Sequence, residues 1–306
     1  YFYRRVLEIV RYFQPGHWYH QDPFAPQKRQ ALEEGLRQLA SFYTSVPAGM
    51  TLQELFTLWL HRSLWGNRFD LSNVQAMVEA QQLHARGTAE DLLLIDHTQD
   101  LWSLLSGGGV SCLDVAADNS GLELLSDLVL LDFLLTHGLV ERARVHCKPQ
   151  PFFVSDAMPQ DMAMTCTALQ GHPLAALQEL GVRLERYQQT GRLAVRTHPF
   201  WARCLFYSQL PDDLARTLGE ADLLLCKGDV NYRRLLEDRH WPPTTDLAQV
   251  VAYMPVSLVT LRTLKGELIV GLPEGVAEAL DRRDPTWMIN GKRGLIHLVH
   301  PQRGGE

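Results

Sequence analysis

Short apolar runs that each lead into polar residues constrain the fold of this chain more than any other feature. The runs are Leu92 to Ile95, Val110 to Ala117, Leu223 to Cys226 and Val256 to Leu261, with a further region at Pro151 to Val154 after Val145 and His146. Helical segments lie between them, at Leu122 to His137, Leu174 to Thr190 and Asp213 to Leu218. This alternation predicts a mainly parallel sheet with helices on both faces, a three-layer α/β/α domain of the α/β class. Trp287 to Val299 adds terminal strands.

The first part of the chain has a helical pattern instead. Ala31 to Tyr43 places three leucines on one face, as an amphipathic helix does. Thr51 begins a TLQE sequence, which is typical of a capping box before a helix. We therefore predict a helical N-terminal subdomain at 1–90 and the α/β/α domain at 91–306. The chain begins at Tyr1 in a helical pattern and without a methionine, so we expect native residues upstream.

The composition is that of a globular protein and argues against several classes. Hydrophobic residues make up 46% of the 306 residues, charged residues 21%, and the net charge is −6, so nothing indicates nucleic-acid binding. The five cysteines contain no CxxC pair, which favours neither a disulfide framework nor a structural zinc site. No apolar run is long enough to cross a membrane, and no signal peptide is visible. We expect a cytoplasmic protein with no membrane contact.

Polar residues follow the apolar runs at the point where each predicted strand ends. They are Asp96, Asp118, Asp156, the Lys227-Gly228-Asp229 turn and the Arg262 to Lys265 segment. Ligands bind open parallel sheets at the carboxyl ends of the strands, so these side chains are expected to converge on one crevice. A single aspartate there is also typical of a helix cap or a turn. The repetition is what favours a functional site.

The sequence from Asp118 to Glu123 reads as strand, tight turn and helix start. Asp118 and Asn119 supply hard oxygen donors, which suit Mg²⁺ or Mn²⁺, and Asp156 adds a second carboxylate. Glu123 lies in the first helical turn and can point back into the crevice. Two carboxylates and one amide leave coordination positions for water and substrate, as a catalytic metal requires.

A second segment offers positive charge at a strand end. Lys227 to Arg233 again reads as strand, turn and helix, with a lysine, a glycine and an arginine close together. Cations near a helix N-terminus oppose its dipole, and an anionic ligand would remove that conflict. Lys265 is a further cation at a strand end, although a lone lysine there is more often a solvated surface residue.

These motifs together resemble the damage-control phosphatases, in the branch called acidic residue methyltransferase-like. The resemblance rests on segments that occur in family order and span nearly the whole chain: LWGNRFDLS at 64–72, DNSGLELLSDLVLLDFLL at 118–135, FVSD at 153–156, HPFW at 198–201, KGDVNYRRL at 227–235 and RTLK at 262–265.

The resemblance implies a function and a set of site residues. It implies hydrolysis of phosphate monoesters of small metabolites, including sugar phosphates such as fructose 1-phosphate, with Co²⁺, Ni²⁺, Mn²⁺ or Mg²⁺. It implies metal ligands at Asp118, Asn119 and Asp156. The implied substrate-binding residues are Asn67, Asp70, Glu123, Lys227, Asp229, Asn231, Arg233 and Lys265. The region from Asp161 to Gly171 is shorter and less aromatic than in the family, so substrate selectivity is expected to differ.

Three other functions compete with a metal-dependent phosphatase. A carboxyl methyltransferase using S-adenosylmethionine needs a Gly-rich turn after a strand, whereas Gly107 to Gly109 precede the Val110 run. A phosphatase with an aspartyl nucleophile needs a DxDx(T/V) sequence, which DNSG does not supply. A non-catalytic protein that binds a phosphorylated metabolite remains an alternative. For the phosphatase, either Asp156 or Glu123 can orient the attacking water, and Lys265 and Arg233 neutralise phosphoryl charge.

Overall fold

The computed structural model describes residues 1–66 and 92–301, and it contains a seven-stranded sheet. The strands are β1 (Leu93–Asp96), β2 (Cys112–Ala116), β3 (Arg142–Cys147), β4 (Leu193–Thr197), β5 (Leu223–Lys227), β6 (Ser257–Thr263) and β7 (Gly294–Val299). Their order across the sheet is β1-β7-β6-β5-β2-β3-β4. Every neighbouring pair is parallel except β6 and β7. The predicted mainly parallel α/β sheet is confirmed.

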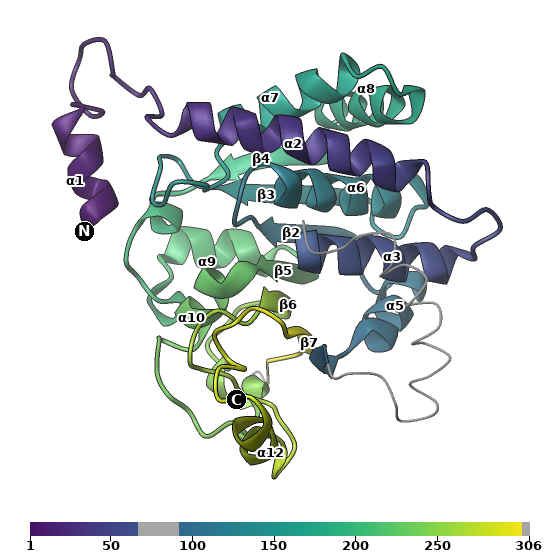
Figure 1. Cartoon of the computed structure of the whole chain (residues 1–306), viewed down its shortest axis with the longest axis vertical. Coiled ribbons are helices and arrows are strands. Elements are labelled where there is room, and N and C mark those ends of the chain that lie inside the picture. Colours follow the sequence, from purple (N-terminus) through teal and green to yellow (C-terminus); the bar gives the residue numbers. More distant parts are fainter. Residues whose placement is uncertain (67–91, 302–306) are drawn as a thin grey trace.

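Helices cover both faces of this sheet (Figure 1). One hydrophobic core lies under α2 (Ala25–Tyr43), α3 (Leu52–Trp65), α5 (Thr98–Ser106), α6 (Leu122–Thr136), α7 (Pro159–Gln170) and α8 (Ala175–Gln189). A second core lies under α9 (Asp212–Gly219), α10 (Gly228–Leu235), α11 (Leu247–Val250) and α12 (Val276–Arg283). Alternate residues of one strand point to opposite faces. In β2, Leu113 and Val115 therefore belong to the first core, and Cys112 and Ala116 to the second.

The helix α6 is central to the first layer. Its sequence LELLSDLVLLDFLLT is apolar on almost every side, and the helix packs between the sheet and the helices α2 and α3. A helix that is apolar all round must be covered on both sides. The N-terminal helices thus share one core with the sheet, and the separate helix α1 (Phe2–Ile9) lies to one side (Figure 1). The predicted boundary between residues 90 and 91 lies outside the described residues.

The strand order reverses between β2 and β5. From β2 the chain continues outward to β3 and β4, and from β5 it continues in the other direction to β6 and β7. The two outgoing connections therefore leave in opposite directions and open a crevice at the carboxyl ends of β2 and β5. Such a switch point is where ligands bind in open α/β sheets.

One local prediction was wrong, and two elements were missed. Pro151 to Val154 is not a strand: the third strand is β3, and residues 148–158 form a loop after it. Pro149 and Pro151 lack the N–H groups that a sheet ladder needs. The strand β4 and the helix α7 were missed. β4 is a half-exposed edge strand with the mixed sequence LAVRT, which carries no clear alternation of apolar and polar residues.

The described residues contain no helix that is both long and apolar enough to cross a membrane. All five cysteines are unpaired, four of them buried and Cys204 exposed.

Candidate functional site

The ends of β2 and β5 meet at Asp118 and Gly228. Asp118 follows β2, and Gly228 is the first residue of α10 after β5. The φ angle of Gly228 is +82°, and a Cβ atom added there would lie 2.0 Å from Oδ2 of Asp118. Only glycine accepts both this backbone conformation and this contact. Two of the predicted strand ends, those of β2 and β5, therefore meet at the switch point. Asp96 instead ends β1 at the edge of the sheet and accepts from the backbone N–H of Thr98.

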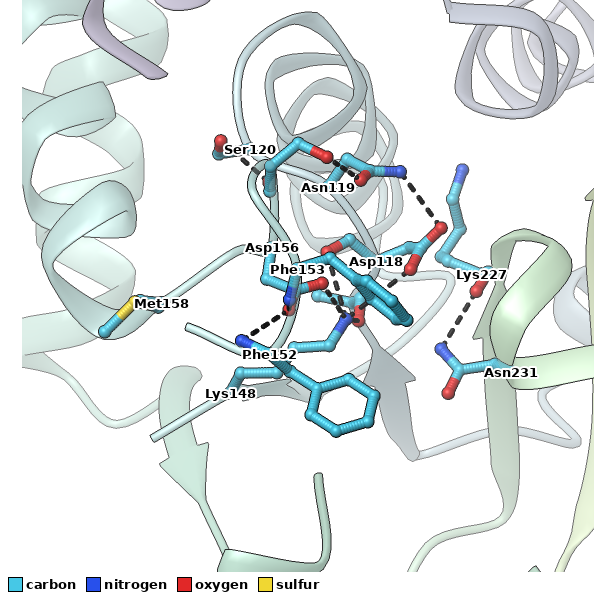
Figure 2. A network of polar contacts seen from close by, with 12 residues as sticks. Asp118, Asn119, Ser120, Lys148, Phe152, Phe153, Asp156, Met158, Lys227 and Asn231 are labelled. Carbon is cyan, nitrogen blue, oxygen red and sulfur yellow. Dashed lines mark hydrogen bonds and ion pairs between the residues drawn. The ribbon is translucent and has the colours of Figure 1, made fainter. Parts of the chain in front are cut away.

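The three predicted metal ligands lie together at the end of β2 (Figure 2). Asn119 and Asp156 form an isolated antiparallel β-bridge, and the backbone N–H of Ala157 donates to the carbonyl of Asp118 at 3.0 Å. This pairing brings Asp156 from the loop after β3 to the neighbouring strand end. The Asp156 side chain is held as well, because its Oδ2 accepts from the backbone N–H groups of Phe152 and Phe153 at 2.9 and 2.5 Å.

A buried lysine that the sequence analysis missed lies between the two aspartates. The Nζ atom of Lys148 is 3.5 Å from Oδ1 of Asp118 and 3.4 Å from Oδ1 of Asp156. It also donates to the carbonyl oxygens of Ala117 and Asp118, at 2.9 and 3.0 Å. Burial alone would lower the pKa of Lys148, but the two carboxylates raise it above the usual value. Lys148 is therefore a charged counter-ion that links the ends of β2 and β3.

The amide of Asn119 links the carboxylates of Asp118 and Glu123. Its Nδ2 donates to Oδ2 of Asp118 at 3.0 Å and to Oε2 of Glu123 at 2.9 Å, and its Oδ1 accepts from Oγ of Ser155 at 2.6 Å. Burial raises the pKa of Asp118 to about 6; Lys148 opposes this rise, and the charges of Glu123 and Asp156 add to it. Burial likewise raises the pKa of Glu123. Carboxylates crowded in this way favour a bound cation.

Lys227 lies beneath Glu123 and is fully buried. Its Nζ is 2.8 Å from Oδ1 of Asp127, 3.8 Å from Oε1 of Glu123, and donates to both the hydroxyl and the carbonyl oxygen of Ser63. Lys227 thus ties the start of α6 to the end of α3. Its direct contact with a substrate stays a prediction, and the geometry gives it a role in positioning Glu123.

The rest of the predicted Lys227 to Arg233 segment is held by neighbouring residues. Oδ1 of Asp229 accepts from Nε of Arg262 at 2.7 Å and from the backbone N–H of Lys265 at 3.3 Å. The amide of Asn231 is buried and donates to the carbonyl of Lys227 at 2.9 Å. Arg233 pairs with Asp238 through two hydrogen bonds, of 2.7 and 2.8 Å. The structure brings these residues near the switch point, while their contact with a substrate stays a prediction.

A cavity of about 440 Å³ opens above this cluster. Asn119, Glu123 and Ser155 line one side, and Lys265 lines it from the turn after β6. Burial raises the pKa of Glu123, and the positive charge of Lys265 lowers it by a smaller amount. The two side chains are therefore close enough for their charges to interact. The predicted residues Asn67 and Asp70 lie outside the described residues.

The predicted metal ligands supply oxygen donors beside this cavity: Asn119 lines it, Asp118 accepts a hydrogen bond from Asn119, and Asp156 pairs with Asn119 through the β-bridge. The described residues contain no group of three or more His, Cys, Asp or Glu side chains arranged for a metal, but the predicted set relies on two carboxylates and an amide. The Nδ2 atom of Asn119 lies 3.0 Å from Oδ2 of Asp118 and 2.9 Å from Oε2 of Glu123, whereas Oδ1 of Asp156 lies 3.4 Å from Nζ of Lys148. Turning the amide over would place its oxygen beside Asp118 and Glu123, and the Ser155 hydroxyl can partner either amide atom. Hard oxygen donors of this kind suit Mg²⁺ and Mn²⁺.

Comparison with known proteins identifies the family. Residues 1–280 match the family described as the damage-control phosphatase ARMT1-like domain. The chain belongs to this damage-control phosphatase family. It is 34% identical to damage-control phosphatase ARMT1 of Danio rerio over 99% of this chain and 72% of that protein. The corresponding protein of Homo sapiens is 32% identical over 98% of this chain and 73% of its own length.

A solved structure agrees with the fold of this damage-control phosphatase family member. A crystal structure of a DUF89 family protein from Pyrococcus horikoshii superimposes with a TM-score of 0.50 and 15% sequence identity, over 91% of this chain and 76% of that one. At that identity the match supports the three-layer architecture alone. The resemblance found in the sequence motifs is thereby confirmed for both family and fold.

Proposed function

We propose that this chain is a metal-dependent phosphatase that hydrolyses phosphate monoesters of small metabolites, with sugar phosphates such as fructose 1-phosphate among its substrates. The observation that carries the proposal is the grouping of Asp118, Asn119 and Asp156 at the switch point, beside a cavity that Lys265 enters. The family name supports the same reaction class.

The proposed site separates two tasks. Asp118, Asn119 and Asp156 hold a divalent ion, Mn²⁺, Co²⁺, Ni²⁺ or Mg²⁺, which supplies Lewis-acid activation of water and of the phosphoryl oxygens when bound. Lys265 binds the phosphoryl group and neutralises charge that develops on it during transfer. Lys265 is exposed and lines the cavity, so it is accessible to a substrate.

The remaining charged residues orient this machinery. Lys148 keeps Asp118 and Asp156 at a fixed separation, and Lys227 with Asp127 fixes the position of Glu123. Glu123 faces the cavity and accepts from Asn119, so it is the carboxylate better placed to orient a water near the substrate. Asp156 has one oxygen bound by two backbone N–H groups and the other near Lys148, which leaves it less free for that task.

The structure offers less support for a methyltransferase. Gly107 to Gly109 lie between α5 and β2, at the amino end of the strand, whereas the turn that follows β2 carries Asp118 and Asn119. Carboxylates and cations in one cavity suit a dianionic phosphate bound with a metal. We also propose a cytoplasmic location, since a reducing compartment suits five unpaired cysteines.

A metal and substrate screen tests the proposed function. Purified protein is incubated with fructose 1-phosphate, other phosphorylated metabolites and p-nitrophenyl phosphate, each with Mn²⁺, Co²⁺, Ni²⁺, Mg²⁺ or a chelator. We expect phosphate release that depends on metal and needs no S-adenosylmethionine. Transfer of labelled methyl groups without ester hydrolysis would refute the proposal in favour of a methyltransferase. Tight binding of a phosphorylated metabolite without turnover would favour the non-catalytic alternative.

A further inference from the structure

One face of the helix α2 lines the same cavity as Asn119, one of the proposed metal ligands. Ala31, Glu34, Gly35 and Gln38 all belong to the cavity wall. Their spacing of three, four and seven residues is that of one helix face. The adjacent Glu33 is exposed and does not line the cavity. The helix therefore presents one particular carboxylate, that of Glu34, to whatever the cavity holds.

Small residues bring this face of α2 close to the turn between β2 and α6, which contains Asn119 and Gly121. A Cβ atom on Gly35 would lie 3.0 Å from backbone atoms of Leu122, the first residue of α6. A Cβ atom on Gly121 would lie 3.0 Å from the Cβ of Ala31. The backbone of α2 thus touches the turn that carries Asn119 and leads to Glu123. Glu34 lines the same cavity as Asn119, Glu123 and Lys265, and its side chain is 50% exposed.

The carboxylate of Glu34 is held in its charged form by an ion pair with Arg37. Its Oε1 accepts from Nε2 of Gln38 at 2.9 Å, and its Oε2 accepts from Nη2 of Arg37. The hydrogen bond from Arg37 is the main reason that the pKa of Glu34 is lowered. The Arg37 side chain is 70% exposed and does not line the cavity. Of the described residues that do line it, Lys265 is the only cation, against the carboxylates of Glu34 and Glu123.

We infer that Glu34 is a specificity-determining residue that restricts this cavity to phosphate monoesters whose organic part carries no negative charge. The inference rests on the proposed function, because it assigns the phosphoryl group to Lys265 and the proposed metal. A second phosphate or a carboxylate on the substrate then meets Glu34, and the only described cation beside it, Arg37, lies outside the cavity wall and is already paired with Glu34. The amide oxygen of Gln38 remains able to accept a hydrogen bond from a neutral, hydroxyl-bearing body.

The test compares two esters that differ in one anionic group. Fructose 1-phosphate has a neutral body, and fructose 1,6-bisphosphate adds a second phosphate. Phosphate release with Mn²⁺ and equilibrium binding by calorimetry are measured for wild type, Glu34→Gln and Glu34→Lys. Two unit charges about 6 Å apart in water change an affinity about threefold. The preference for fructose 1-phosphate should therefore fall about threefold in Glu34→Gln and about tenfold in Glu34→Lys. A purely structural effect would lower kcat/KM for both esters equally.

Glu33→Gln and Glu33→Lys are the matched controls, because Glu33 carries the same charge on the same helix outside the cavity. Their preference should equal that of wild type. Wild-type turnover of fructose 1-phosphate combined with an unchanged preference in both Glu34 variants would overturn the inference and leave the proposed function standing. Absence of any turnover would refute the proposed function. The ratio of the binding constants of fructose 1-phosphate and fructose 1,6-bisphosphate, compared between wild type and the Glu34 variants, would then test the role of Glu34 separately. Binding of neither ester would overturn both.

Discussion

Replacing Gly228 by alanine tests the contact on which the site depends. The added Cβ would lie 2.0 Å from Oδ2 of Asp118, whereas real Cβ contacts are essentially never below 3.0 Å. The Asp118 carboxylate or the α10 backbone must therefore move by about 1 Å. A misplacement of about 1 Å in an active site can reduce a rate about 10²-fold. Alanine at a φ of +82° also costs about 1–2 kcal/mol of stability.

Gly275→Ala separates the two effects. Gly275 directly precedes α12 with a φ of +80°, but a Cβ atom there has nothing within 4 Å. Gly275→Ala should lose about 1–2 kcal/mol in urea unfolding, because it places alanine in the left-handed region. Gly228→Ala should lose more than this, because the contact with Asp118 adds to the backbone cost. Phosphate release from fructose 1-phosphate with Mn²⁺ should fall about 10²-fold in Gly228→Ala alone. Equal activity in the two variants would show that Asp118 is not part of the reaction, and the account of the switch point would fail.

Three further predictions concern lysines: Lys265, which lines the cavity, and Lys227 and Lys28, which are buried in ion pairs. Lys265→Ala should lower kcat/KM about 10²-fold, chiefly through KM, and change the unfolding free energy by less than about 0.5 kcal/mol. The control Lys292→Ala, at another exposed lysine, should have the same small effect on stability and keep full activity. Equal kinetics in the two variants would show that Lys265 is not part of the site. Lys227→Met should cost about 3–5 kcal/mol in urea unfolding because Asp127 is left buried without its partner, and adding Asp127→Leu should recover much of that loss; no recovery would mean that the ion pair is not the cause. Lys28→Met should cost a similar amount, about 3–5 kcal/mol, because two buried carboxylates lie 2.8 and 2.9 Å from its Nζ, and a loss below about 1 kcal/mol would contradict this.

The sheet was predictable wherever a buried strand leads directly into a polar turn. β2 and β5 are buried along their whole length, and each precedes a turn with a glycine, so apolar runs and turn residues point to the same structure. β4 combines partial exposure with a mixed sequence, and no local pattern marks it. Its place at the sheet edge is fixed by pairing with β3, which is a tertiary contact.

The site was predictable in its residues and less so in their contacts. Asp156 was assigned to a strand end, but it reaches Asn119 through a loop and a single β-bridge. Lys148 carried a usable signal, since it directly follows β3 and the same strand-end rule applies to it. That signal was lost because the strand was placed at Pro151 to Val154. Lys227 shows the opposite case, because its motif indicates a phosphate contact while its side chain is buried against Asp127 and Ser63.

The role of α2 was not accessible from the sequence. Its helical pattern predicts a buried leucine face, and that face is present. The cavity wall uses the neighbouring face, where Gly35 and Ala31 permit close approach to the turn before α6. A small residue on a helix permits close packing only where another segment lies against it. Here that segment is Gly121 and Leu122, about ninety residues further along the chain.

The central claim is that Asp118, Asn119 and Asp156 hold the catalytic metal, and anomalous diffraction from crystals grown with Mn²⁺ tests it most directly. The account predicts one strong anomalous peak at the carboxyl end of β2, within bonding distance of oxygen atoms of all three residues, near the 2.1 Å typical of Mg²⁺ sites. The Nδ2 of Asn119 should have given way to the amide oxygen. Crystals saturated with Mn²⁺ that show no peak at this position, or a peak bound by other residues, would contradict the account.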